Sequence, residues 1–600
     1  MSAKDIRDRL QLLRKSMAED AVTAYLIYTG DFHNSEYVND YFKVREFFSG
    51  FTGSNGTLLV MTGEAGLWTD GRYFVQAERE LEGSGITLYR SGEEKVPTIM
   101  EFLEEKLSEK DILAIDGRVV QASLGKKLKK IGKKKGFKLY YKKDYSEGIF
   151  VRPPFPVSKA ELLSEELTGE NVSTKINRVL EKTRKAGADA VFISKLDDIM
   201  WLFNIRGDDV DYNPVLMSYA YLSGDRKVLF LQKEAVTEEL RAGMAASSVE
   251  IADYWEAEAF LSDREKDQGA LLMDPCDSSY LFYKIAKKQG KVIFEDNPTA
   301  ALKAVKNPVE ISHMRDIYRK DSVALTKFIY RLLKEMEEEN PSIELTENGA
   351  ADLLLHFRQQ IPEFRGLSFS TISAYGANAA MMHYEPSAER PVDLKKEHLL
   401  LVDSGGQYFG GTTDVTRTIV LGPISEEERK AFTLTAVSML HLLNAVFFYG
   451  CTGRNLDILA RRRMWEQGMD YKCGTGHGIG YILNVHEGPQ NIRWKAAENE
   501  AVLEEGMALS DEPGVYRKDE FGIRTENILL VQKAFHTEDG QFMKFENLTL
   551  VPIDDKGIDR TIMTDEEISQ YLAYQTQVCE ALSPYLTEEE NHWLRTYAGI

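Results

Sequence analysis

The sequence predicts two α/β domains followed by a larger α+β domain. In about the first 150 residues, apolar strand-like runs alternate with helical stretches, and the same order of elements returns after residue 190. From residue 308 onward, helices alternate with pairs of strands without a βαβ period, which indicates an antiparallel sheet. The length of 600 residues also exceeds what one ordinary hydrophobic core fills.

The first predicted domain covers residues 1–155. It opens with an amphipathic helix over residues 4–18, whose apolar positions at helical spacing are Ile6, Leu10, Leu13 and Met17. The elements expected after it are strands over 22–28 and 57–61 and a helix over 96–107. The lysine-rich run 126–135 is typical of the solvated face of a helix, with an anionic ligand as the alternative.

The second predicted domain covers residues 156–307 and partly repeats the first. Pro153 to Pro156 breaks regular structure and marks the boundary between the two. A strand, aspartates, an aromatic-rich turn with glycine and two further strands then follow, over 190–193, 197–198, 201–207, 219–222 and 228–231. We interpret this recurrence as a degenerate duplication of one α/β domain.

The third predicted domain covers residues 308–600. Asn307 and Pro308 mark its start, because proline is well tolerated in the first turn of a helix. The expected helices are 309–338, 346–358, 425–447, 454–467 and 564–598. The expected strands are 399–403, 414–420, 507–511 and 525–531.

Composition excludes several classes of function. The formal net charge of −21 argues against nucleic acid as a partner, since phosphate binding needs a basic surface. No apolar run of about 18 residues occurs, so no membrane span is expected. The N-terminus lacks a signal-peptide pattern, and Cys276, Cys451, Cys473 and Cys579 lie too far apart for a disulfide framework or a structural zinc site. A cytoplasmic protein is therefore expected.

Two carboxylate pairs and one histidine indicate a metal site in the third domain. A symmetric hairpin formed by strands 399–403 and 414–420 places Asp403 opposite Asp414, with Cβ atoms about 5 Å apart. A second hairpin places Glu512 opposite Glu526. Carboxylates held so close repel one another unless a cation lies between them. The alternative is an acidic turn in solvent, which the apolar flanks of the strands disfavour.

A nitrogen ligand is expected from His477, which stands in the sequence Gly-Thr-Gly-His-Gly-Ile-Gly. The flanking glycines remove bulk and let the imidazole approach a ligand closely. The alternative is a hydrogen-bonded core histidine. Four carboxylates and one imidazole exceed the needs of one catalytic Zn²⁺ and suit two divalent ions. Mn²⁺ is favoured because oxygen ligands dominate, with Zn²⁺ and Co²⁺ as alternatives.

These motifs carry a resemblance to a known family. The order Asp403, Asp414, Gly-Thr-Gly-His-Gly-Ile-Gly, Asp-Glu-Pro-Gly and Ile-Arg-Thr-Glu-Asn resembles the signature of the pita-bread metallopeptidases. Asn-Val-His-Glu-Gly-Pro at 484–489 and Met-His-Tyr at 382–384 resemble their proline-specific branch. Further motifs at 49–54, 68–74, 201–207 and 545–552 extend the resemblance to the large three-domain Xaa-Pro aminopeptidases of the cytosolic type. Two creatinase-like α/β domains and a pita-bread α+β catalytic domain are thereby implied.

The resemblance also implies roles for the metal-site residues. Asp403 would bind one metal ion, and His477 with Glu512 would bind the other. Asp414 and Glu526 would bridge both ions. Glu512 would in addition take a proton from the bridging water, as general base.

Four further residues receive roles from the same resemblance. His383 and His486 would bind the substrate and steady the oxyanion of the tetrahedral intermediate. Arg524 would orient the carboxylates and help to relay protons. Arg72 would reach from the N-terminal domain to touch the peptide, with an ordinary salt bridge as the alternative.

The implied activity is removal of an N-terminal residue when proline follows, by attack of a water that bridges two metal ions. Peptides with proline in second position are the implied partners, and a homodimer is the implied assembly. The alternatives are a prolidase restricted to dipeptides, a metal-free hydrolase like creatinase, and a non-catalytic peptide- or protein-binding module. The intact five-ligand set disfavours the last two.

Cys473 departs from the family pattern. The family often carries a histidine four residues before the metal-binding one, and cysteine stands there in this chain. None of the five ligands is lost, so the expected consequence is a changed substrate contact or pH optimum. A nucleophilic role for Cys473 is the alternative, which metal-activated water would make unnecessary.

Overall fold

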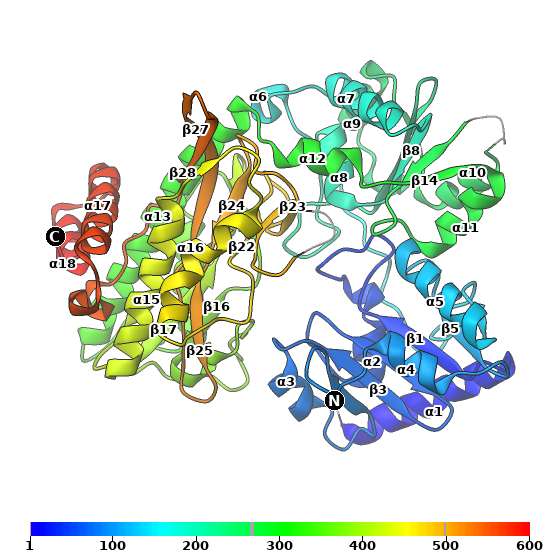
Figure 1. Cartoon of the computed structure of the whole chain (residues 1–600), viewed down its shortest axis with the longest axis horizontal. Coiled ribbons are helices and arrows are strands. Elements are labelled where there is room, and N and C mark those ends of the chain that lie inside the picture. The colour runs from blue at the N-terminus through cyan, green and yellow to red at the C-terminus, as the bar shows by residue number, and fades with distance from the viewer. Residues whose placement is uncertain (1, 265–268, 497–499) are drawn as a thin grey trace. The chain divides into compact units, whose positions relative to one another are not determined.

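The computed structural model describes residues 2–264, 269–496 and 500–600. The chain divides into two compact units (Figure 1). The first unit comprises Met1–Ser164 and Glu170–Thr299, and the second comprises Glu165–Gly169 and Ala300–Ile600. The division into three domains at residues 155 and 307 stays a prediction.

The first unit contains two six-stranded sheets with the same topology. The strand order in the first is β4 (Thr87–Arg90), β3 (Ala65–Thr69), β2 (Thr57–Met61), β1 (Ala24–Tyr28), β5 (Ile112–Ile115) and β6 (Lys138–Tyr140). The order in the second is β12 (Glu250–Asp253), β11 (Lys227–Leu231), β10 (Ser218–Ser223), β8 (Ala190–Ile193), β13 (Leu271–Met273) and β14 (Val292–Phe294). Parallel and antiparallel pairs occur at the same places in both. This shared topology is what a duplicated domain predicts.

Helices cover both faces of the first sheet, and the buried side chains of β1 accordingly alternate between two cores. Tyr25 and Ile27 pack in one core with α1 (Ala3–Glu19) and α2 (Val44–Ser49). Ala24 and Leu26 pack on the other face with α4 (Ile99–Lys106) and α5 (Ala122–Lys135). A sheet buried on both faces is typical of an α/β domain. The buried positions of α1 are the four that helical spacing predicted.

The remaining helices of the first unit are α3 (Phe74–Glu80), α7 (Val172–Lys185), α8 (Leu196–Phe203), α9 (Glu238–Ala246), α10 (Ala257–Ser262) and α11 (Tyr280–Gln289). The segment 201–207, expected to be a turn, begins inside α8 instead. Eight consecutive buried residues make up this helix, and Asn204 ends it in the left-handed conformation.

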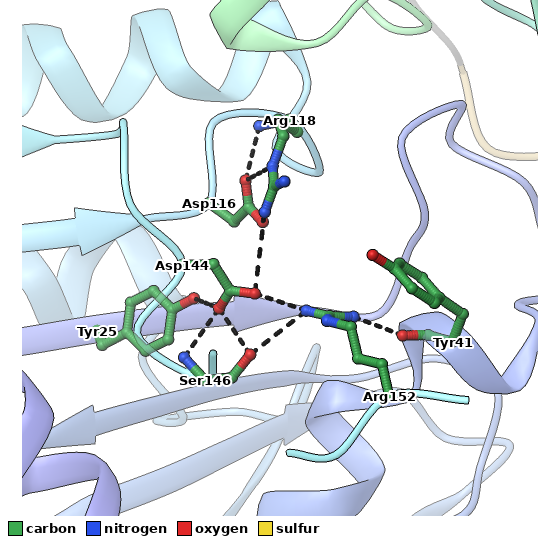
Figure 2. A network of polar contacts seen from close by, with 7 residues as sticks. All are labelled: Tyr25, Tyr41, Asp116, Arg118, Asp144, Ser146 and Arg152. Atoms are coloured by element: carbon green, nitrogen blue, oxygen red, sulfur yellow. Dashed lines mark hydrogen bonds and ion pairs between the residues drawn. The ribbon is translucent and has the colours of Figure 1, made fainter. Parts of the chain in front are cut away.

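A buried polar network fastens the end of the first domain to its sheet (Figure 2). Asp144 accepts hydrogen bonds from the Tyr25 hydroxyl at 3.0 Å and from the Ser146 hydroxyl at 2.6 Å. Arg152 donates to the other oxygen of Asp144 and to the backbone carbonyl of Tyr41. Arg152 directly precedes the proline-rich segment 153–156, so the network fixes the point where the chain leaves the first domain.

The second unit is built on antiparallel sheets. A six-stranded sheet runs in the order β21 (Val446–Phe448), β28 (Gly540–Asn547), β27 (Asn527–Thr537), β24 (Ala508–Asp511), β22 (Gly476–Gly478) and β23 (Glu487–Ile492). Smaller sheets comprise β16 (Ile372–Tyr375), β17 (Leu399–Ser404) and β20 (Val415–Val420), then β15 (Phe364–Leu367), β18 (Gly406–Tyr408) and β19 (Gly411–Thr412), and the pair β25 (Gly514–Arg517) and β26 (Phe521–Arg524). The predicted antiparallel α+β architecture is confirmed.

Five helices of the second unit begin within one residue of a predicted start. They are α13 (Pro308–Glu337), α14 (Glu347–Arg358), α15 (Glu426–Leu443), α16 (Gly453–Glu466) and α17 (Asp565–Leu582). The expected helical tail 564–598 is divided, because a second helix, α18 (Glu588–Tyr597), follows α17. The helices α6 (Glu165–Thr168) and α12 (Pro298–Ala304) were not predicted. The Asn307 side chain caps α13 and Pro308 occupies its first turn. Helices α15 and α16 lie side by side (Figure 1) and pack against the six-stranded sheet. None of the helices in the described ranges is long and apolar enough to cross a membrane.

Candidate metal centre

Three predicted ligands converge in the second unit. Asp414, His477 and Glu526 each offer one ligand atom, and these atoms lie within 4.8 Å of one another. Asp414 directly precedes β20, His477 lies in β22, and Glu526 directly precedes β27. Glu512 joins them, since its Oε1 lies 3.4 Å from His477 Nε2, and Asp414 Oδ2 lies at the same distance from that nitrogen. Two ligands bound about 2.1 Å from one ion lie roughly 3–3.5 Å apart, so these spacings fit a shared metal.

The first hairpin has a different register from the symmetric one expected. Asp403 pairs with Thr416 rather than with Asp414. The same register continues through β18 and β19, so the turn is centred on Phe409 and Gly410. Gly410 has a φ of +125°, which favours glycine, and this places the turn one residue later than expected. Moving the turn by one residue changes the partner of Asp403 by two residues, from Asp414 to Thr416. Residues two apart on a strand share a face, so the side chains of Asp403 and Asp414 still lie on the same face of the hairpin.

The second hairpin has the predicted register. Asp511 pairs with Asn527 and Gly514 pairs with Arg524, so Glu512 lies opposite Glu526 between two paired segments. The two hairpins lie in separate sheets and are joined by hydrogen bonds. The Glu526 N–H donates to Thr416 O at 3.1 Å.

Further hydrogen bonds hold the ligands in place. Thr416 Oγ1 donates to Glu526 Oε2 at 2.7 Å. Ser510 Oγ donates to Glu512 Oε1 at 3.1 Å and accepts from the His477 N–H at 3.0 Å. Sequence patterns did not single out Thr416 or Ser510. Both could have been found from the sequence, because each is a hydroxyl residue on a strand expected to be buried, two positions from a predicted carboxylate ligand.

The geometry of His477 leaves Nε2 as its ligand atom. Its Nδ1 lies 3.0 Å from Gly478 O, and a carbonyl only accepts, so Nδ1 carries the proton. The neighbouring glycines Gly476 and Gly478 are required for strand packing. A Cβ atom at Gly476 would lie 1.9 Å from Ser510 O, and one at Gly478 would lie 2.2 Å from Glu487 O. Only glycine lets β22 fit between β23 and β24.

The electrostatics of the site favour a bound cation. Burial, together with the nearby Asp414 and Glu512, raises the pKa of Asp403 to about 6, although Arg524 opposes the shift. Burial and the charges of Asp414, Asp403 and Glu512 raise the pKa of Glu526 well above its ordinary value. Asp403 Oδ1 is buried and, among the described residues, has no hydrogen-bond donor. Crowded buried carboxylates with a free acceptor fit hard divalent cations.

Arg524, predicted to orient the carboxylates, contacts one of them directly. Its guanidinium forms an ion pair with Asp403 Oδ2, donates to Thr416 Oγ1 at 3.0 Å and donates to the Tyr516 hydroxyl at 2.6 Å. Arg524 is buried, so these contacts fix its orientation. The residue thereby links the Asp403 carboxylate and the Thr416 hydroxyl of the first hairpin to the Tyr516 hydroxyl of the second.

The predicted substrate-side residues lie in different surroundings. His486 is exposed, and its ring centroid lies 4.2 Å from that of His477 at an interplanar angle of 87°. His383 is exposed in the loop between the short helix η4 (Gly376–Ala380) and β17. Arg72 lies in the first unit and forms two hydrogen bonds of 2.8 Å with the Asp70 carboxylate. Its predicted contact with peptide stays a prediction.

Cys473 is not activated as a nucleophile. Burial, reinforced by Glu512, raises the pKa of its thiol to about 12. A thiol with this pKa carries almost no thiolate at neutral pH, and the thiolate is the reactive form. The structure therefore disfavours the alternative of cysteine catalysis.

Comparison with known proteins identifies the family. Residues 312–533 match metallopeptidase family M24, and residues 541–598 match the C-terminal region of that family. Residues 9–139 and 151–310 each match the creatinase/prolidase N-terminal domain. The chain is 33% identical to Xaa-Pro aminopeptidase 1 of Dictyostelium discoideum, covering 98% of this chain and 96% of that protein. It is 34% identical to aminopeptidase P1 of Arabidopsis thaliana, and the match covers 98% of this chain and 98% of that protein.

Structural similarity leads to the same family. The crystal structure of an X-prolyl aminopeptidase from Caenorhabditis elegans, described as a cytosolic enzyme with a di-nuclear active site, matches with a TM-score of 0.92. The match covers 100% of this chain and 99% of that chain, at 32% sequence identity. The Xaa-Pro dipeptidase of Bacillus anthracis, at 22% identity and a TM-score of 0.51, shares the fold. The chain belongs to metallopeptidase family M24, in the group of the Xaa-Pro aminopeptidases.

Proposed function

We propose that this protein is a dinuclear-metal Xaa-Pro aminopeptidase that removes the N-terminal residue of peptides with proline in second position. The observation that carries the proposal is the convergence of Asp414, His477 and Glu526, with Glu512 beside them, in a chain of this family. Proline peptides need a dedicated peptidase, because their tertiary amide lacks an N–H and proline fixes φ.

The five predicted ligands would hold two divalent ions. Asp403 would bind one ion, His477 and Glu512 the other, and Asp414 and Glu526 both. The 3.4 Å spacings around His477 Nε2 and the free Asp403 oxygen support this assignment. Two ions bound in this way supply polarisation of the peptide carbonyl and activation of the attacking water.

The residues around the centre would perform the proton transfers and bind the substrate. Glu512 would take the proton of the attacking water on a carboxylate oxygen, with its position fixed by Ser510. His383 and His486 would contact the peptide and steady the developing oxyanion. Arg524 would keep Asp403 ionised and oriented, which its ion pair supports. Arg72 would also contact the peptide.

We propose Mn²⁺ as the metal, with Zn²⁺ and Co²⁺ as alternatives. Four of the five donors are carboxylates, and oxygen-rich sites suit Mn²⁺ better than Zn²⁺. We further propose a cytoplasmic homodimer. An assembly would cover exposed aromatic residues such as Trp465 and Trp494, whose exposed fractions are 43% and 48%. Sedimentation velocity tests the dimer, and a monomer at all concentrations would contradict it.

Substrate length separates this function from that of a prolidase. The enzyme should cleave an Arg-Pro-Pro tripeptide after its first residue when loaded with Mn²⁺. A prolidase would cleave only an Arg-Pro dipeptide. Release of products from both substrates is followed by chromatography, and activity restricted to the dipeptide would contradict the proposal.

A further inference from the structure

A buried cluster of three charges lies directly beneath the loop that carries His486. Glu487, the next residue, has a side chain that is 0% exposed. The ammonium group of Lys306 forms an ion pair with Glu487 Oε1, and Lys303 Nζ lies 3.2 Å from Glu487 Oε2. The two lysine side chains are 2% and 1% exposed. None of the three residues belongs to the metal centre.

Stability alone does not explain such a cluster. Removing charges from water costs several kcal/mol for each ion, and their attraction offsets this cost only when the geometry is good. Well-packed apolar side chains of the same volume are often equally stabilising. A buried ion cluster next to a functional loop therefore suggests a requirement for a defined position.

The cluster connects the backbone segments on which His477 and His486 stand. Lys306 Nζ also donates to the carbonyl of Ile479 at 2.7 Å, two residues beyond His477. Glu487 opens β23 and pairs with Gly478 of β22, where the register of the two strands shifts. The Lys306 ammonium group therefore joins the two strands next to the point where their register shifts.

The lysines are themselves anchored to the scaffold. Lys303 lies in α12, and Lys306 directly precedes the Asn307 cap of α13. The Lys306 N–H donates to Gly506 O at 3.0 Å, and Val305 forms an isolated bridge with Met507. The backbone that carries the two lysines is thus fixed by its own hydrogen bonds. Their ammonium groups extend from it to Glu487 and restrict the position of its carboxylate.

We propose that Glu487 is a positioning residue for His486. Its carboxylate, held by Lys303 and Lys306, fixes the exposed imidazole of His486 edge-on to the ring of His477. Glu487 is too deeply buried to touch a substrate, so it acts only through its neighbour. The inference rests on the proposed function in one respect, which is the role of His486 in binding peptide.

The first test substitutes Glu487→Gln, which keeps the shape of the side chain and removes its charge. We expect kcat to fall roughly 10- to 100-fold with two metal ions still bound, because small displacements of a substrate-binding group have effects of that size. In a His486→Ala background, the same substitution should cause no further loss. If Glu487 were merely structural, its substitution would lower the melting temperature and would lower kcat by the same factor whether or not His486 is present.

If Glu487→Gln does not fold, Lys303→Met removes one charge of the cluster and serves in its place.

A second readout needs no enzymatic activity. Diethyl pyrocarbonate modifies exposed histidines, and mass spectrometry with fragmentation can follow His486 separately from His477. The rate at His486 should change at least threefold in Glu487→Gln, while the rate at exposed His592 on α18 stays constant. The control is Glu567→Gln, which breaks a partly buried ion pair with Arg463 of 2.8 Å elsewhere in the same unit. This control should lower the melting temperature and leave kcat and the His486 rate unchanged.

Two results would overturn the proposal. One is a Glu487→Gln enzyme with wild-type kcat and a wild-type modification rate at His486. The other is an equal fractional loss of kcat with and without His486. If the wild-type enzyme fails to cleave any Xaa-Pro peptide, the proposed function fails instead, and the modification rates alone decide the positioning role.

Discussion

The two hairpins that carry the carboxylates differ in how their turns are specified. The hairpin with Glu512 and Glu526 follows one register from Ala508 to Leu530, and it has the predicted pairing. The hairpin with Asp403 and Asp414 turns one residue later than a symmetric loop predicts. Its carboxylates nevertheless point to the same side. The face of the strand on which a side chain lies is therefore easier to predict than the residue that pairs with it. A turn moved by one residue changes the paired residue by two, and residues two apart lie on the same face.

The hairpins also differ in what holds their carboxylates. In the first, Asp403 is bound by Arg524, and Asp414 faces His477. In the second, hydroxyl groups from Thr416 and Ser510 hold Glu526 and Glu512. Substitutions in the two hairpins therefore test whether both contribute to one centre.

The largest effect is expected from Asp414→Asn in the first hairpin. Loss of a bridging carboxylate should remove several kcal/mol of transition-state stabilisation, which lowers kcat about 10³-fold or more. The fold should persist, as followed by circular dichroism. Near-normal turnover by this variant would refute the bridging role.

A smaller effect is expected from removing the hydroxyl that joins the hairpins. Thr416→Val keeps the shape of the side chain but leaves Glu526 and Arg524 each without one hydrogen bond. Hydrogen bonds to charged groups contribute about 1.5–3 kcal/mol, so kcat/KM should fall roughly 10- to 100-fold. Ser510→Ala in the second hairpin should cause a comparable loss, and Ser438→Ala on α15 is the buried control. A wild-type rate for Thr416→Val would mean that the hairpins act independently.

The raised pKa of Asp403 predicts how the metal-free protein responds to pH. The pKa of this acid in the folded state, about 6, exceeds the value of about 4 in an unfolded chain. The folded state thus binds the proton more tightly, and this contribution to stability is lost as the pH rises from 4 to 6.

After removal of metal with a chelator, the Asp403→Asn variant should therefore melt a few degrees higher than the wild-type protein, and this difference should grow between pH 4.5 and 6.5. Differential scanning calorimetry measures the two proteins side by side. Added Mn²⁺ should abolish the advantage, since the cation compensates the carboxylate. A difference that does not vary with pH would show that Asp403 is not the titrating group.

The smallest effect is expected at Cys473. Its protonated thiol takes no part in the proposed chemistry, so Cys473→Ser should retain kcat within about twofold. Inactivation by this substitution, with folding and metal content intact, would reinstate cysteine catalysis.

Much of the fold was predictable because the patterns are local. The four buried positions of α1 and the cap at Asn307 follow from spacing and capping alone. The repeated sheet topology also agreed with the repeated order of elements. Tertiary contacts were not predictable in the same way. The role of Thr416 depends on two sheets meeting, and that of Ser510 depends on the pairing of β22 with β24 within one sheet. The glycines beside His477 are required by neighbouring strands.

The buried cluster at Glu487 shows the same limit. Lys303 and Glu487 are 184 residues apart in the sequence, and nothing in either segment indicates that the other is its partner. Each residue alone resembles an ordinary surface charge. Only their common burial in the folded unit separates them from the solvated lysines of α5.

Metal analysis combined with peptide cleavage tests the central claim most directly. The purified protein should bind two divalent ions per chain and cleave Arg-Pro-Pro after the arginine. Exhaustive chelation should abolish cleavage, and Mn²⁺ should restore it. Cleavage that survives complete removal of metal would contradict a dinuclear centre built from Asp403, Asp414, His477, Glu512 and Glu526.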